Sequence, residues 1–239
     1  MSALARPEAI AREIRRDILG GRYRPGERLP SERELAARAG ANRGSAREAL
    51  KILAQQRLIE IRPGGSRVIP LHRASLEVLR HVLEREEGPD PALVAQLLDV
   101  HELLLAGAVR LTVERASEEE LWRARELVDT LCDPRLPQAD YLRTLAELLE
   151  LIAEASRNLV LRMVGNGLLA ILASVVVLLR SLRPPHAALA SALPPIREAL
   201  VRRDPAAAEQ GIRALLRLKR EHLLKELERS AVPTRARHV

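Results

Sequence analysis

The sequence predicts a mainly α-helical protein. An N-terminal winged helix-turn-helix with a small β-hairpin wing is followed by an antiparallel bundle of six to seven helices. Three observations lead to this fold class. Residues 31–52 read as two short helices joined by a tight turn, the apolar residues are mostly Leu and Ala, and the positive charge is concentrated in the first third of the chain.

The apolar composition favours helices over sheets. Apolar residues make up 47% of the 239 positions, yet there is no Phe, one Trp and two Tyr. The core must therefore be built from Leu, Ala, Val and Ile. Leu and Ala are strong helix formers, whereas β-sheets are enriched in aromatic and β-branched residues.

The net charge of +7 is unevenly distributed along the chain. Residues 1–75 contain 16 Lys and Arg against 8 Asp and Glu, whereas the remaining 164 residues contain 23 against 24. An excess of positive charge on one small module is typical of a protein that binds a polyanion such as DNA. The sequence therefore predicts a basic binding module joined to a nearly neutral partner domain.

The first helix is expected over residues 7–19, with Pro7 at its opening turn and an isoleucine at every fourth position. The next begins after Ser31, because Ser31 and Glu34 have the spacing of a capping box, and it ends at Gly40. A third starts at about Asn42 or Arg43. Its apolar residues recur at i, i+3, i+4 and i+7 and face inward: Ala46, Ala49, Leu50 and Leu53.

The start and outer face of this third helix carry residues suited to the DNA major groove. Arg43 and Arg47 can bind guanine edges or phosphates, Asn42 can bind adenine, and Ser45 can bind the backbone. Residues 58–61 alternate as a strand, residues 62–66 form a turn, and residues 67–70 return as a second strand, while residues 28–30 leave room for one very short strand. A hairpin in this place is a wing. It brings Arg62, Gly64, Gly65 and Arg67 near phosphates or the minor groove.

These motifs resemble those of the GntR family of bacterial transcriptional regulators. The resemblance rests on residues 24–36 (RPGERLPSERELA), on Asn42-Arg43 and on residues 47–50 (REAL), and it covers about residues 7–70. It implies that Arg33, Arg43 and Arg47 are the main arginines in contact with DNA, with Asn42 and Ser45 beside them.

The rest of the chain reads as helical. A helical stretch at residues 72–87 leads to a linker with two prolines, and helices are expected at 91–115, 117–131, 138–155, 158–182, 187–203 and 205–230. The expected domains are residues 1–75 for DNA binding, a linker helix and loop at 76–90, a helical ligand-binding and dimerisation domain at 91–230, and a disordered tail at 231–239.

The helical domain resembles the FadR-type, or FCD, ligand-binding domain over about residues 76–228. The resemblance rests on helix-boundary motifs such as residues 114–121 (ERASEEEL), 152–158 (IAEASRN) and 198–205 (EALVRRDP). Many members of that family hold a metal ion with one Asp and three His. The matching positions here are Leu145, Leu149, Leu193 and Leu215, and two further pocket positions are His101 and Leu105. Leucine cannot coordinate a metal, so no metal or other cofactor is expected.

Two interpretations of this leucine-rich centre remain open. The leucines could form a collapsed core without a ligand, since burying each one contributes roughly 1.5–3 kcal/mol. Alternatively they could line an apolar pocket for an aliphatic chain, oriented by a few polar groups such as His101. The resemblance favours the second, because the FadR branch includes metal-free regulators that bind long-chain acyl-CoA.

The sequence thus predicts a homodimeric transcriptional regulator that binds a palindromic operator in double-stranded DNA and senses a fatty-acid or acyl-CoA-like effector. The alternative is a regulator or architectural DNA-binding dimer with a collapsed, effector-free core. No enzyme is expected, since the chain lacks a nucleophile elbow and a phosphate loop. With no signal peptide, and with the apolar run at 168–179 too short for a membrane span, a cytoplasmic protein without membrane contact is expected. The one cysteine, Cys132, excludes an internal disulfide and is expected to be a buried packing residue.

Overall fold

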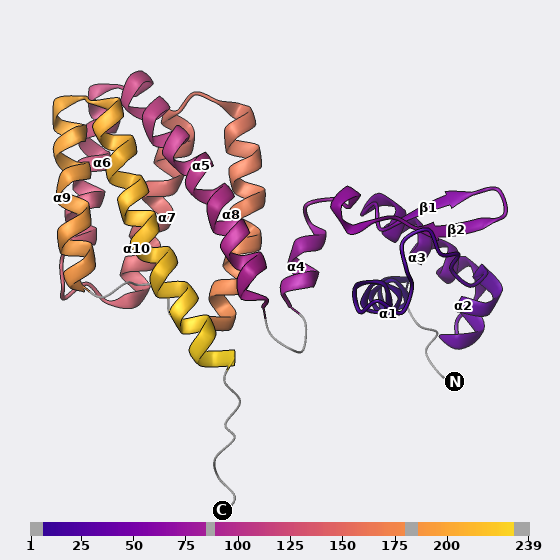
Figure 1. Ribbon diagram of the computed structural model, residues 1–239. Helices are drawn as coiled ribbons and strands as arrows, with labels where there is room; N and C mark the ends of the chain where they lie inside the picture. Colours follow the sequence, from indigo (N-terminus) through magenta and orange to yellow (C-terminus); the bar gives the residue numbers. More distant parts are fainter. Residues whose placement is uncertain (1–6, 85–88, 180–185, 232–239) are drawn as a thin grey trace, which may run out of the picture. The chain divides into compact units, whose positions relative to one another are not determined.

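The computed structural model describes residues 7–84, 89–179 and 186–231 (Figure 1). The chain divides into two compact units, residues 1–82 and residues 83–239. Each unit has its own hydrophobic core. The described residues are mainly helical, with one two-stranded antiparallel sheet, which confirms the predicted fold class.

The first unit begins with three helices at the predicted positions. They are α1 (Pro7–Leu19), α2 (Glu32–Arg38) and α3 (Arg43–Gln55). The Ser31–Glu34 capping box is present in both directions, which fixes the start of α2. Gly40 has φ +59° just after α2, a left-handed conformation that glycine adopts without strain, so the chain can turn sharply into α3. Helices α1 and α2 both pack on α3, around buried Ile10, Ile14, Leu35, Leu50 and Leu53.

The wing is a tight hairpin of β1 (Ile59–Arg62) and β2 (Gly65–Val68). Ile59 pairs with Val68 and Arg62 with Gly65, so only Pro63 and Gly64 form the turn. The sequence analysis was wrong on this register, because it placed a five-residue turn at 62–66 and the second strand at 67–70. The left-handed φ of +92° at Gly64 lets two residues close the hairpin. The expected short strand at 28–30 is reduced to a single bridge between Arg28 and Arg67.

The helical stretch expected at 72–87 is interrupted. A 3₁₀ turn, η1 (Leu71–Arg73), is followed by α4 (Val78–Leu83), with a break over residues 74–77. At Ala74 the backbone is extended, with φ −67° and ψ +161°, and this conformation ends the turn. Residues 85–87 of the predicted stretch lie outside the described residues.

The second unit contains six described helices that follow the predicted segments closely. They are α5 (Pro91–Arg115), α6 (Glu118–Leu131), α7 (Gln138–Ala155), α8 (Leu159–Leu179), α9 (His186–Arg202) and α10 (Pro205–Ala231). Local caps explain the agreement. Asp90 caps α5 before Pro91, and Ser117 with Glu120 forms a second capping box at α6. Residues 232–239, most of the predicted tail, lie outside the described residues.

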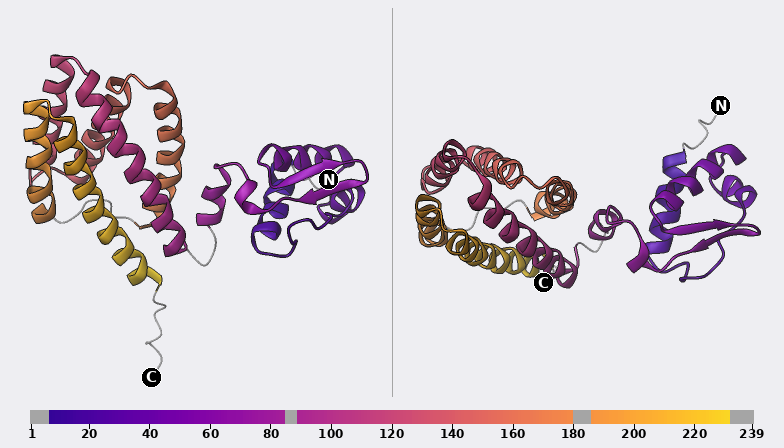
Figure 2. Two further views of the ribbon diagram at one scale, coloured as in Figure 1. Left: turned by 45° about the horizontal axis from the view of Figure 1, so that its top comes forward. Right: turned by 90° about the horizontal axis from the view of Figure 1, so that it is seen from above.

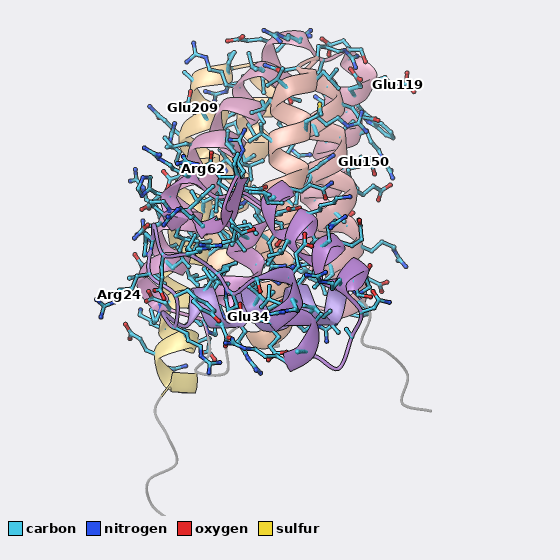
Figure 3. All side chains as sticks on the ribbon, turned by 90° about the vertical axis from the view of Figure 1, so that its right-hand side faces the viewer. Arg24, Glu34, Arg62, Glu119, Glu150 and Glu209 are labelled. Carbon is cyan, nitrogen blue, oxygen red and sulfur yellow. The ribbon has the colours of Figure 1, made fainter. Side chains whose placement is uncertain are left out.

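Helix α5 packs against α10, α7 and α8, and α10 also packs against α9 (Figure 2). Gly211 permits a close approach of α10 to α9, since a Cβ atom there would lie 2.7 Å from Cγ1 of Ile196. Charged side chains such as Glu119 and Glu150 point outward from the bundle (Figure 3). Apolar side chains pack against one another between the helices.

Among the described helices, α5 has the length and apolar composition that crossing a membrane would require. This is weak evidence, because the core helix of a helical bundle passes the same test, and α5 packs against three other helices of its unit. The sequence analysis had raised the membrane question for residues 168–179 instead.

Candidate DNA-binding surface and effector cavity

Helix α3 presents its charged face to solvent because its apolar face is buried. Asn42 lies at its N-cap, where the side-chain Oδ1 accepts a hydrogen bond from the Ser45 backbone N–H at 2.8 Å. The cap satisfies an N–H group that would otherwise lack a partner at the start of the helix. It occupies the side-chain oxygen of Asn42 and leaves its amide nitrogen for another partner.

The three arginines that the resemblance singles out are all exposed, but they differ in their partners. Arg33 and Arg43 form no hydrogen bond or ion pair within the described part of the chain. Arg47 on α3 instead forms a two-point ion pair with Glu32 on α2, with Nε–Oε1 and Nη2–Oε2 distances of 3.1 Å. The hydrogen bond from Arg47 lowers the pKa of the Glu32 carboxyl. The guanidinium groups of Arg33 and Arg43 are therefore available to a further partner, whereas that of Arg47 already binds Glu32.

In the wing, the side chains of Arg62 and Arg67 have different partners. Arg62 Nη2 lies 2.7 Å from Oε2 of Glu60, and both side chains are exposed. Arg67 Nη1 donates a hydrogen bond of 3.0 Å to the Gly26 carbonyl and so ties the wing to the loop before α2. Gly65, with φ +127°, is closely covered by Arg28, since a Cβ atom there would lie 2.6 Å from Arg28 Nε.

Sequence reasoning missed Arg28. It is exposed, and a β-bridge joins it to Arg67 of the wing. Through this bridge and its contact with Gly65, Arg28 adds a positive charge to the surface of the wing. The sequence offered one indication that Arg28 lies near the wing, because it begins the predicted short strand at 28–30.

In the second unit, a cavity of about 610 Å³ opens between the helices, and all six contribute to its lining. Its volume falls within the range of roughly 300–1,000 Å³ typical of small-molecule sites. The structure brings all six predicted pocket residues together in its wall: His101, Leu105, Leu145, Leu149, Leu193 and Leu215. Most of the remaining lining is also aliphatic.

A few polar side chains interrupt this apolar wall. His101 on α5 is largely desolvated, and this burial, with a smaller contribution from the charge of Lys219, lowers its pKa to about 4. Lys219 on α10 also lines the cavity, and burial lowers its pKa to about 8. His222 lies one turn further along α10, with its Nε2 atom buried and without a hydrogen-bond partner.

Sequence reasoning found His101 but not Lys219 or His222. The signal was present, because both follow Leu215 at i+4 and i+7 and so share its face of the helix. Among the described residues, no group of three or more His, Cys, Asp and Glu side chains is placed to hold a metal ion. Cys132 is half-buried at the C-terminal end of α6 and packs against the bundle core.

Comparison with known proteins agrees with this division of the chain. Residues 7–69 match the family of bacterial regulatory proteins named gntR, and residues 96–218 match the FCD domain. The regulator Mce2R of Mycobacterium tuberculosis is 29% identical over 223 residues, 91% of each chain. The galactonate operon transcriptional repressor of Escherichia coli is 32% identical over 49% of this chain and 52% of its own. A solved structure of Lar, which controls the agr system of Listeria monocytogenes, covers 96% of this chain and 99% of its own with a TM-score of 0.55 and 14% identity, and so shares the fold.

A winged helix-turn-helix followed by a helical effector-binding domain defines a DNA-binding transcriptional regulator, not an enzyme. The chain belongs to the GntR family, in the group whose second domain is an FCD domain.

Proposed function

We propose that this chain is a cytoplasmic, homodimeric regulator of the FadR group that binds a palindromic operator and releases it when an aliphatic effector enters the FCD domain. The observation that carries the proposal is the leucine-lined cavity within the bundle. Predicted positions from α5, α7, α9 and α10 meet in its wall. An open cavity also favours an effector over the alternative of a collapsed core.

The DNA-binding half of the proposal rests on the exposed face of α3 and on the wing. Arg33, Asn42, Arg43, Ser45 and Arg47 would bind the major groove and its phosphates, with Arg62, Gly64, Gly65 and Arg67 at the neighbouring backbone or minor groove. A free guanidinium suits base recognition because its paired donors match the two acceptors of guanine. Arg43 best meets this requirement, since it is exposed in the first turn of α3.

Dimerisation is supported by apolar side chains that the isolated bundle leaves in solvent. On α8, Leu159, Val160 and Met163 are 71%, 70% and 67% exposed, and on α5 Leu103 is 63% exposed. Clusters of large exposed apolar side chains commonly mark protein–protein interfaces. A two-fold dimer would place two winged modules on two operator half-sites, so the operator would share this symmetry.

An effector can release DNA only as far as it binds one state better than the other. Switching almost completely requires a difference of about 5 kcal/mol between the DNA-bound and DNA-free states. An aliphatic chain can supply a difference of this size if the cavity closes around it in one state only, since each buried CH₂ contributes about 0.8 kcal/mol.

Selection of bound duplexes from a random DNA library by the full chain tests this proposal. The proposal predicts a palindromic site, and it predicts that dodecanoate lowers the affinity of the dimer for that site. Selection of a non-palindromic sequence would contradict the dimeric mode of binding. Affinity that dodecanoate leaves unchanged would favour the effector-free alternative.

A further inference from the structure

Among the described residues that line the cavity, seven have acidic, basic or imidazole side chains, in a wall that is otherwise mostly aliphatic. A charge in an apolar wall is costly unless a partner compensates it, so the partner of each group matters. The seven come from α5, α7, α8 and α10: His101, Glu102, Glu150, Arg162, Lys219, Arg220 and His222.

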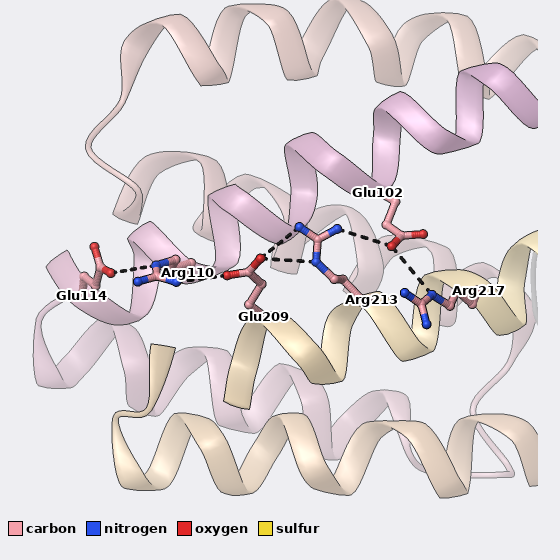
Figure 4. Close-up of polar contacts among 6 residues, drawn as sticks. All are labelled: Glu102, Arg110, Glu114, Glu209, Arg213 and Arg217. Carbon is pink, nitrogen blue, oxygen red and sulfur yellow. Dashed lines mark hydrogen bonds and ion pairs between the residues drawn. The ribbon is translucent and has the colours of Figure 1, made fainter. Parts of the chain in front are cut away.

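Two of the charged groups, Glu102 and Arg220, are compensated by ion pairs between α5 and α10. Glu102 lies between Arg213 at 3.4 Å and Arg217 at 3.8 Å, in a ladder of ion pairs that joins α5 to α10 (Figure 4). Arg220 pairs with Asp99 on α5. These pairs satisfy the charges of Glu102 and Arg220 beside the cavity.

The same holds for the helices on the other side. Arg162 on α8 lies 3.1 Å from Glu154 and 3.9 Å from Glu150, both on α7. Glu150 is also largely exposed to solvent, with 71% of its side-chain surface accessible. Neither Arg162 nor Glu150 is therefore an unmatched charge in the wall.

Lys219 differs from all of these groups. It forms no hydrogen bond or ion pair within the described part of the chain, and aliphatic side chains such as Leu215, Leu216 and Leu223 share its part of α10. Burial lowers its pKa to about 8, so the ammonium group is still mostly protonated at neutral pH. The cavity thus contains one positive charge whose partner the described residues do not supply.

Two imidazoles flank this ammonium group. His222 lies on the same face of α10 at i+3, and its buried Nε2 has no hydrogen-bond partner in the described part of the chain. His101 lies on α5, which packs against α10, and the charge of Lys219 contributes to its lowered pKa. An unmatched cation beside an unused polar nitrogen is an arrangement that an anionic oxygen pair would complete.

We infer that the cavity binds an aliphatic molecule with a single anionic head group, a carboxylate, held by Lys219 Nζ and by an N–H donated from His222 Nε2. This inference rests on the proposed function, since it requires the cavity to be the effector site. The leucines of the wall then bury the aliphatic chain of the ligand. Lys219 and His222 hold its head group and so fix its orientation in the cavity. His101, neutral at pH 7, borders the head group as a further hydrogen-bonding group.

The test compares two probes of equal chain length, dodecanoate and dodecanol, by calorimetric titration of the full chain at neutral pH. The variants are Lys219→Met and, as a control, Lys225→Met, an exposed lysine two turns away on α10 that does not line the cavity. Thermal unfolding of each variant shows whether it is folded. Replacing Lys219 is expected to weaken dodecanoate binding by about 10- to 100-fold, the effect typical of losing a charged hydrogen bond. Dodecanol binding should change little, and the control should match the wild type.

The outcomes separate this inference from the proposed function. If dodecanoate binds Lys219→Met as well as the wild type, the anionic head group is not recognised by Lys219, and the inference is overturned while an apolar effector site stands. If the wild type binds neither probe, the effector site itself is wrong and both proposals fall. Selective loss of dodecanoate binding supports both.

Discussion

Arg47 and Glu32 lock the two helices of the helix-turn-helix together through two contacts of 3.1 Å. The pair is largely exposed, with 63% of the Arg47 side chain and 35% of the Glu32 side chain accessible. Exposed ion pairs typically contribute only about 0–1 kcal/mol to folding stability. The pair therefore matters more for where the Arg47 guanidinium lies than for the stability of the unit.

The first prediction follows from this pair. Arg47→Ala should weaken operator binding, because it removes a proposed DNA contact. It should leave the unfolding free energy within about 1 kcal/mol of the wild type, because the only intramolecular interaction it removes among the described residues is an exposed ion pair. Glu32→Gln should tighten binding, since it removes a carboxylate that competes with phosphate for Arg47. Fluorescence anisotropy with labelled duplex measures both. If Glu32→Gln binds the operator more weakly, Glu32 holds Arg47 in place for DNA contact and does not compete with phosphate for it.

Arg43 is expected to read a base. Arg43→Ala should cost about 1–3 kcal/mol of operator binding and relax sequence preference at one position in each half-site. Arg143→Ala, an exposed arginine on α7 of the second unit, is the control and should leave binding unchanged. A loss of affinity that is equal for all sequences would instead assign Arg43 to a phosphate.

Asn42 has two candidate roles, and one substitution separates them. Asn42→Ser keeps a side chain that can cap α3, so stability should be retained, whereas Asn42→Ala should cost about 1 kcal/mol. If the free amide of Asn42 reads adenine, Asn42→Ser should still lose sequence preference. Unchanged preference in a stably folded Asn42→Ser variant would limit Asn42 to the cap.

The buried charge of Lys219 should lower the unfolding free energy of the ligand-free protein. Its pKa is lowered from 10.5 to about 8 by burial, so the unfolded state binds more protons between these two values. Stability should therefore rise as pH increases from about 8 to 10.5, by up to roughly 3 kcal/mol, and Lys219→Met should lack this rise. At neutral pH, Lys219→Met should be more stable than the wild type by a similar amount. Denaturant unfolding across this pH range measures the unfolding free energy of both proteins. If the wild type and Lys219→Met show the same dependence on pH, Lys219 is well solvated.

Local signals made most of the helices predictable. Capping residues such as Ser31, Ser117 and Asp90 act within a few residues of the helix they start, so the sequence alone contains the information. The paired prolines Pro194 and Pro195 would ordinarily predict a break in the helix, yet α9 runs through both. The hairpin register was missed because it depends on the backbone conformation at Gly64, which sequence spacing does not reveal.

The features of the candidate site that could not be predicted from the sequence depend on residues far apart in the chain. The attachment of Arg47 to Glu32 spans fifteen positions, and nothing in either helix pattern predicts it. Lys219 looked like an ordinary charged residue of a long amphipathic helix. Only the packing of α10 against α5 and the cavity between the helices reveal that it lies in a largely aliphatic wall and has no partner among the described residues.

Native mass spectrometry of the full chain, purified from its expression host, tests the central claim most directly. We expect a homodimer that carries one aliphatic acid per subunit, or that takes up one dodecanoate per subunit after delipidation. A dimer that arrives bare and takes up no dodecanoate would contradict an effector site in the leucine-lined cavity.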